Sequence, residues 1–286
     1  MDLFFDLLRS VIYGVIEGIT EWLPISSTGH MILAEQVLKF SFSAEFMEMF
    51  RVVIQLGAIL AVVVMYFKKL WPFCVDNGRD SGLAKHVRWP VMRLWFKIIV
   101  ACLPAAVLGL ALDDWIDAHF YNSVVVAVML IVYGIAFILI ERRPRVPTTT
   151  KLSRITYRQA LIVGAWQVLA LIPGTSRSGS TIIGGLLCGM SRACASQFTF
   201  FLAIPVMAGA SGLKLVKFLV GGGVFTVAEV GALLVGCIVA FVVSIMAIRF
   251  LMDYVKKHTF TIFGWYRIAL GILVLGIWAL QTFVLA

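Results

Sequence analysis

Two polar, glycine-containing stretches interrupt segments of this sequence that are otherwise apolar. The first runs from Glu17 to His30 (EGITEWLPISSTGH) and the second from Pro173 to Gly179 (PGTSRSG). Carboxylates, a histidine and an arginine are expensive to place in lipid, so such groups inside an apolar segment serve chemistry or transport by default. These two stretches are therefore the first candidates for a functional site.

The first stretch combines groups suited to holding a metal with groups suited to binding an anion. Glu17 and Glu21 are four residues apart, so on a helix they lie one turn apart on the same face. Two carboxylates this close share a proton or hold a cation, and Mg²⁺ or Ca²⁺ with oxygen ligands is the simpler solution. A helix start with free backbone N–H groups, which bind anions, is predicted just after Pro24, at Ser26, Ser27, Thr28 and Gly29. His30, which comes next, is a candidate base or nucleophile.

The second stretch carries Arg177, the only charged residue between Gln159 and Ser191. A guanidinium stays charged and presents a planar fork of donors that matches phosphate oxygens. Hydroxyls and glycine backbone surround it, so this stretch is predicted to clamp an anion with a set of neighbouring residues: Gly174, Ser176, Ser178, Gly179 and Thr181.

The composition excludes a soluble globular protein. Of the 286 residues, 61% are hydrophobic and 14% charged, and the mean hydropathy is +0.99, against about half apolar and a quarter charged in soluble domains. The sequence predicts an all-α polytopic membrane protein, one membrane domain over 1–286, with six transmembrane helices near 46–67, 92–112, 122–140, 196–218, 229–250 and 265–284. The apolar segments 4–40 and 157–190 contain the polar stretches, and each is predicted to be a re-entrant helical hairpin.

The formal net charge of +9 follows from the membrane topology rather than from a nucleic-acid partner. Basic residues gather after the spans 46–67 and 122–140, which the positive-inside rule places in the cytoplasm. The intervening connection around 113–117 is acidic and is predicted to be an outer loop. Both termini are then expected on the outer side of the membrane. The apolar faces of the spans are expected to contact membrane lipids.

The two halves of the chain resemble each other at an offset of 150 residues, with Ser26 matching Ser176 and Gly29 matching Gly179. Repeats of about 1–145 and 151–286 would each contain one hairpin and three crossings, and an odd number of crossings inverts the second repeat. An inverted-topology repeat would bring the two hairpin tips together near the bilayer midplane. Because Glu17 corresponds to Gln167, the first half is expected to carry the reactive groups and the second to hold the anion.

Carboxylates for a divalent cation, a nucleophile or base, and an arginine with backbone donors are the parts of a phosphoryl-transfer site. Together the two motifs resemble the undecaprenyl-pyrophosphate phosphatase family, the bacitracin-resistance type of integral membrane phosphatase. The resemblance covers essentially the whole chain and includes residues 50–57 (FRVVIQLG). It implies hydrolysis of undecaprenyl pyrophosphate to undecaprenyl phosphate and inorganic phosphate, which recycles the lipid carrier for peptidoglycan, at a site open to the outer face of the bacterial cytoplasmic membrane.

The resemblance also implies roles for individual residues. Glu17 and Glu21 would bind the metal or activate the nucleophile, Ser27 and His30 would lie at the reacting phosphorus, and Arg177 would hold the pyrophosphate. Further substrate contacts are expected from the hydroxyl and glycine residues named above and from Gln55. The leaving group is a weakly basic phosphate monoester, so His30 is expected to act as base or nucleophile rather than acid; attack by water, Ser27 or His30 stays open.

Two other functions compete with the enzyme. Inverted repeats and broken helices also describe secondary transporters, so the protein could flip a polyprenyl phosphate across the bilayer. It could also bind such a lipid without turnover. A pure carrier has no evident need for Ser27, His30 and two carboxylates together, which favours the enzyme. Whether the chain forms a homodimer is left open by its glycine-rich helix surfaces.

Overall fold

The protein is helical throughout the residues that its computed structural model describes, which are 2–75, 78, 82–143 and 146–283, and no β-strand occurs among them. Six helical stretches are long and apolar enough to cross a membrane: Ala44–Leu70, Trp89–Leu112, Ser123–Glu141, Arg192–Val220, Val227–Lys257 and Thr261–Phe283. Each coincides with a predicted span to within four residues at either end, except that Val227–Lys257 continues seven residues beyond its prediction. This agreement confirms a multi-pass, all-helical membrane protein.

Helix boundaries differ from the prediction in two of these stretches. The first stretch is two helices, α3 (Ala44–Val53) and α4 (Gln55–Leu70), which meet at Ile54. The predicted outer loop around 113–117 is wrong: α5 (Trp89–Phe120) continues through these positions. The ten residues that end α5 contain neither glycine nor proline to stop the helix. The side chains of Asp113, Asp114 and Asp117, on which the prediction depended, lie outside the described residues.

The two polar stretches each join a pair of shorter helices. The first pair consists of α1 (Asp2–Thr20) and α2 (Ser27–Val37). The second pair consists of α7 (Tyr157–Val168) and α8 (Arg177–Leu187), with the 3₁₀ turn η3 (Leu169–Leu171) between them. Helix α1 ends at Thr20, inside the first stretch, and α7 ends before the second. A new helix begins inside each stretch, at Ser27 and at Arg177, as the capping residues and prolines predict.

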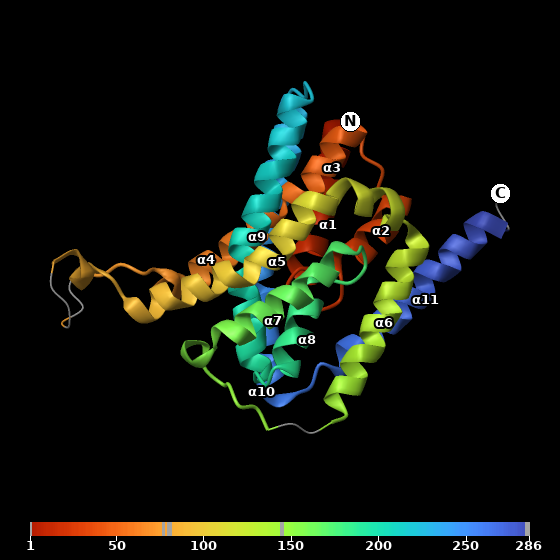
Figure 1. Cartoon of the computed structure of the whole chain (residues 1–286). Helices are drawn as coiled ribbons and strands as arrows, with labels where there is room; N and C mark the ends of the chain where they lie inside the picture. The colour runs from red at the N-terminus through yellow and green to blue at the C-terminus, as the bar shows by residue number, and fades with distance from the viewer. Residues whose placement is uncertain (1, 76–77, 79–81, 144–145, 284–286) are drawn as a thin grey trace.

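Close packing of helices positions these pairs. Helix α1 packs on α10 (Val227–Lys257), α7 packs on α5, and α6 (Ser123–Glu141) packs along α11 (Thr261–Phe283) (Figure 1). Glycines allow these approaches: a Cβ at Gly14 would lie 2.7 Å from the carbonyl oxygen of Gly236, and one at Gly164 would lie 2.4 Å from that of Ala101. Small residues at helix contacts are the usual means of packing in membranes, where lipid gives no hydrophobic drive between helices.

The N-terminus and the connection between α6 and α7 lie at opposite ends of the molecule (Figure 1). The N-terminus lies near the C-terminal end of α9 (Arg192–Val220), whereas the connection between α6 and α7 lies at the far end (Figure 1). The large core cluster of buried apolar side chains includes Trp22, Phe200 and Phe201, so the first polar stretch begins against this core. The site is therefore held by the centre of the fold rather than by a surface loop.

Candidate active site

The structure brings the two polar stretches into direct contact, as the sequence predicts. Two nitrogens of Arg177, Nε and Nη2, donate to Oε1 of Glu21 at 3.1 and 2.9 Å. Nη1 of the same guanidinium donates to the backbone oxygen of Thr199 on α9 at 2.9 Å. Between the turns themselves, the hydroxyl of Ser178 donates to the carbonyl oxygen of Leu23 at 3.4 Å. The carboxylate half and the anion-binding half of the predicted site thus form one unit.

Glu17 lies one helical turn before Glu21, and its backbone oxygen accepts from the Glu21 amide at 3.1 Å. Its side chain is buried, with 1% of the residue exposed, and its Oε1 has no hydrogen-bond partner among the described residues. A buried carboxylate oxygen without a partner is costly, by several kcal/mol if charged. This orphaned oxygen fits a carboxylate that is completed by a bound cation.

A cavity of about 630 Å³ adjoins Glu17. Three further residues predicted for the site, Ser27, Thr28 and Gln55, also line it. Among the described residues, neither His30 nor Arg177 belongs to its wall. The cavity therefore gathers predicted residues of the first half. Arg177 contacts Glu21, which is one turn from Glu17 and does not itself line the cavity.

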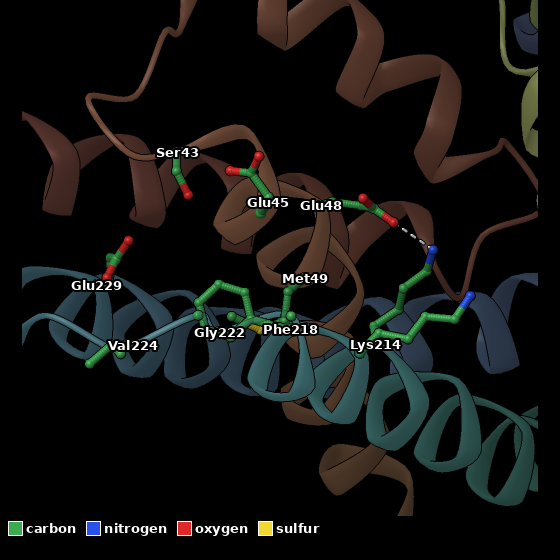
Figure 2. A pocket seen from close by; sticks show the side chains of 12 residues that line it. Ser43, Glu45, Glu48, Met49, Lys214, Phe218, Gly222, Val224 and Glu229 are labelled. Carbon is green, nitrogen blue, oxygen red and sulfur yellow. Dashed lines mark hydrogen bonds and ion pairs between the residues drawn. The ribbon is translucent and has the colours of Figure 1, made fainter.

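Two cations on the cavity wall were missed by the sequence reasoning. Arg51 on α3 pairs with Glu35, and Nζ of Lys214 on α9 donates to Glu48 at 2.6 Å. A second cavity of about 460 Å³ shares Lys214 and Glu48 with the first, and Figure 2 shows this ion pair at its edge. Each cation stands in an apolar span, and that position alone could have flagged it as functional.

Ser26 and Ser176 are the only non-glycine residues with positive φ in the described part of the chain, at 72° and 71°. Each is the N-cap residue of its helix, and they stand 150 positions apart. The Ser176 hydroxyl accepts from the amide of Gly179 at 3.2 Å, while the Ser26 hydroxyl is buried without a partner among the described residues. Backbone held in a sparsely populated region costs on the order of 1–3 kcal/mol and concentrates at functional sites.

His30 is held by two hydrogen bonds. Its Nδ1 lies 2.7 Å from the backbone oxygen of Ser26, and its Nε2 lies 2.7 Å from the hydroxyl of Tyr266 on α11. A carbonyl oxygen only accepts, so in the neutral ring Nδ1 carries the proton and Nε2 accepts from Tyr266. The two rings also stack, 5.6 Å apart. The nitrogen with the lone pair is thus turned to Tyr266.

The remaining predicted substrate contacts pack against protein in this structure. The Thr181 hydroxyl donates to the backbone of Arg177 and accepts from Thr199 at 2.9 Å. Gly174 has a φ of +89°, and a Cβ there would lie 2.5 Å from the carbonyl oxygen of Val126, so the turn requires glycine at this position. Gly29 and Gly179 likewise face other side chains, those of Leu130 and Arg267.

Arg267 on α11 is the third cation that the sequence reasoning missed. It is fully buried at 0% exposed. Its guanidinium donates to the backbone oxygens of Gly174 and Thr175 at 2.9 and 2.8 Å and to that of Pro24 at 3.2 Å. The sequence does show a lone arginine in the last apolar span, which could have marked it as a functional candidate. Its hydrogen-bond acceptors could not be predicted, because they belong to turns distant in sequence.

These features define a multi-pass helical membrane protein with a buried, charged site between two polar turns. The family described as bacitracin resistance protein BacA matches residues 10–273, and the chain belongs to this family.

Its relatives match over nearly their full length. The chain is 59% identical over 278 residues to an undecaprenyl-diphosphatase of Enterococcus faecalis, covering 96% of this chain and 99% of that protein. It is 57% identical to an undecaprenyl-diphosphatase of Lactococcus lactis subsp. lactis, covering 94% and 96% of the two chains. A third protein of that name, from Streptococcus gordonii, is 55% identical with 98% of both chains covered.

Proposed function

We propose that the protein hydrolyses undecaprenyl pyrophosphate to undecaprenyl phosphate and inorganic phosphate, and so returns the lipid carrier to cell-wall synthesis. The relatives that match over nearly the whole chain are named undecaprenyl-diphosphatase. This name favours the enzyme over the carrier alternative. The observation that carries the chemistry is the contact between Arg177 and Glu21, which joins the anion-binding turn to the carboxylate turn beside a cavity.

In the proposed reaction an oxygen nucleophile or His30 attacks the terminal phosphorus, and the bond from that phosphorus to the bridging oxygen breaks. If Ser27 or His30 attacks, water then hydrolyses the phosphorylated side chain and releases inorganic phosphate. The lipid phosphate leaves as a weak base, so the reaction needs charge neutralisation and alignment more than a strong acid. Ser27 lines the cavity with Glu17, whereas Nε2 of His30 accepts from Tyr266. This arrangement supports Ser27 or a water molecule as the attacking group. To act as a base, His30 would have to release the hydroxyl of Tyr266 from Nε2.

Cations from both halves of the chain would hold the pyrophosphate. Arg177 would share its guanidinium between Glu21 and a phosphate oxygen, since bidentate donors suit both anions. Arg51 and Lys214, each paired with a glutamate on or beside the cavity, would exchange these carboxylates for the second phosphate. The hydroxyls of Ser27 and Thr28 would add hydrogen bonds from the cavity wall.

A divalent cation, Mg²⁺ or Ca²⁺, would be held by Glu17 and Glu21. The unpartnered oxygen of Glu17, one helical turn from Glu21, supports this assignment. A site with two carboxylates that leaves positions for substrate phosphates is the usual arrangement for Mg²⁺. When bound, the ion would neutralise charge on the phosphate oxygens.

The site would open to the outer face of the bacterial cytoplasmic membrane, within an inverted repeat of two re-entrant hairpins. Helices α2 and α8 cover positions 27–37 and 177–187, which correspond at the offset of 150. The packing partners exchange between halves, since α1 packs on α10 and α7 packs on α5. Both facts support the inverted repeat, in which the turns would meet inside the membrane.

The test is inorganic phosphate release from undecaprenyl pyrophosphate by the purified protein in detergent, with and without EDTA. Release without sealed compartments requires catalysis, because transport needs two sides. Metal-dependent release by the wild type is the expected result. Well-folded protein that binds the lipid but releases no phosphate would contradict the proposal and favour a carrier.

A further inference from the structure

Arg267 occupies a position that burial alone does not explain. Its guanidinium is fully buried, and the contacts of its charge are backbone oxygens and the face of the Tyr133 ring at 5.5 Å. No acidic side chain pairs with it among the described residues. A buried cation without a counter-ion is expensive, and an ionisable residue inside a membrane span is a candidate for function by default.

The acceptors of Arg267 come from both polar turns at once. Nη1 donates to the oxygen of Pro24, which directly precedes Ile25 and the strained Ser26 of the first turn. Nη2 donates to the oxygens of Gly174 and Thr175, which precede the strained Ser176 of the second turn. One planar fork therefore spans the gap between the turns and fixes their separation.

The adjacent residue on α11 contacts the same site. Tyr266 donates to Nε2 of His30 and stacks on its ring. One turn of α11 thus reaches His30 and the backbones of both polar turns. Helix α11 is itself packed closely on α6, where a Cβ at Gly264 would lie 2.7 Å from the carbonyl oxygen of Gly134. The guanidinium of Arg267 is consequently carried by a helix that is held in place by close packing.

We propose that Arg267 is a positioning residue for phosphate-bond hydrolysis: its guanidinium clamps the carbonyls of the two polar turns, and so sets the placement of Glu17, Glu21 and Ser27 relative to Arg177. This proposal rests on the proposed function. It predicts that Lys at this position is not an adequate substitute, because a single ammonium keeps the charge but lacks a fork that spans both turns. Misplacement by about 1 Å between reacting groups costs roughly 100-fold in rate.

The activity test compares Arg267→Lys with the wild type, counting only monodisperse protein that melts cooperatively in detergent. We expect kcat to fall roughly 100-fold, with KM changed far less because Arg177 remains to bind phosphate. Arg192→Lys is the matched control: Arg192 pairs with Glu141 away from the turns, and its replacement should leave kcat unchanged. Wild-type kcat in Arg267→Lys would overturn the proposal, whereas an inactive wild type would instead overturn the proposed function.

A double-variant cycle separates positioning from general support of the fold. In an Arg177→Ala background the second turn no longer contributes its cation. The rate should then depend little on the alignment of the two turns. The further loss caused by Arg267→Lys should then be within about threefold, whereas independent effects multiply. A second full 100-fold loss would mean that Arg267 only supports the fold, and would overturn the proposal.

A distance measurement does not depend on turnover. Spin labels at Val37→Cys and Leu187→Cys, in a background with the five native cysteines replaced, report the ends of α2 and α8, which begin at the two turns. We expect a shifted or broadened distance distribution in Arg267→Lys and in Arg267→Met. An unchanged distribution in folded Arg267→Lys would show that the clamp does not set the placement of the turns.

Discussion

At the scale of single residues, the proposed site depends on a buried ion pair whose arginine is also the proposed ligand of the substrate phosphate. Arg177 and Glu21 have side chains only 12% and 7% exposed. Breaking such a pair leaves an uncompensated buried charge, which costs about 3–5 kcal/mol of stability. A single substitution therefore lowers activity and stability together, and the two causes cannot be distinguished. The two effects become separable when both partners are changed.

Arg177→Ala should lower kcat/KM by roughly a thousandfold or more, because an arginine on a transferring phosphoryl group has effects of that size, and it should also lower the melting temperature. Adding Glu21→Gln removes the unpaired charge, so the double variant should regain stability without regaining activity. Phosphate release and thermal unfolding in detergent measure both. Lys256→Ala, which breaks an exposed pair with Asp253, is the control and should alter neither. Activity that recovers along with stability would remove Arg177 from the substrate site.

Glu17 offers the complementary case, since its Oε1 bonds to no described protein group. Glu17→Gln should therefore not lower the melting temperature, because it breaks no bond to protein at Oε1 and leaves no buried charge. It should raise the Mg²⁺ concentration for half-maximal phosphate release at least about tenfold, because ligand charge tunes affinity for the ion. Glu45→Gln changes another carboxylate of the same cavity and should leave that concentration as in the wild type. If Glu17→Gln titrates with Mg²⁺ like the wild type, the metal assignment is wrong.

At the scale of helices, the features that sequence could predict are those set by local chemistry. Length and hydropathy define a span, and Pro24 and Pro173 with their capping serines mark the turns. The break at Ile54 could not be predicted locally, because residues 50–57 (FRVVIQLG) contain no proline and no serine, threonine, asparagine or aspartate to cap a helix. Arg51, Lys214 and Arg267 were missed for a different reason: their partners belong to other helices, so their roles depend on packing that spacing along the chain does not encode.

The close helix contacts make their own prediction. Gly14→Ala and Gly164→Ala should each lower the free energy of unfolding by about 1–3 kcal/mol, the cost of overpacking, because the added Cβ would meet backbone at 2.7 and 2.4 Å. Gly209→Ala is the control, since a Cβ there meets no heavy atom within 4 Å, and alanine favours a helix. Thermal unfolding in detergent compares the three. Equal melting temperatures would contradict the packing of α1 on α10 and of α7 on α5.

At the scale of the whole molecule, the site lies between the two halves of the chain rather than within either one. Glu21 comes from the first half and Arg177 from the second, and Arg267 joins both turns from the last helix. A half-chain would therefore hold the carboxylates or the anion clamp but not both. In the proposed inverted repeat, Glu17 and Gln167 would be corresponding positions whose divergence gave the two turns different chemistry.

The side of the membrane on which this shared site opens is the remaining prediction. Val224, 81% exposed, lies on the cavity that shares Lys214 and Glu48 with the candidate site, while Val146, 91% exposed, lies in the connection between α6 and α7. In a background with the native cysteines replaced, Val224→Cys should react with a membrane-impermeant maleimide in intact cells, and Val146→Cys only after the cells are permeabilised. Basic residues flank the second position, so it should be cytoplasmic. The reverse pattern would turn the site inward, and the enzyme would then act on lipid in the cytoplasmic leaflet.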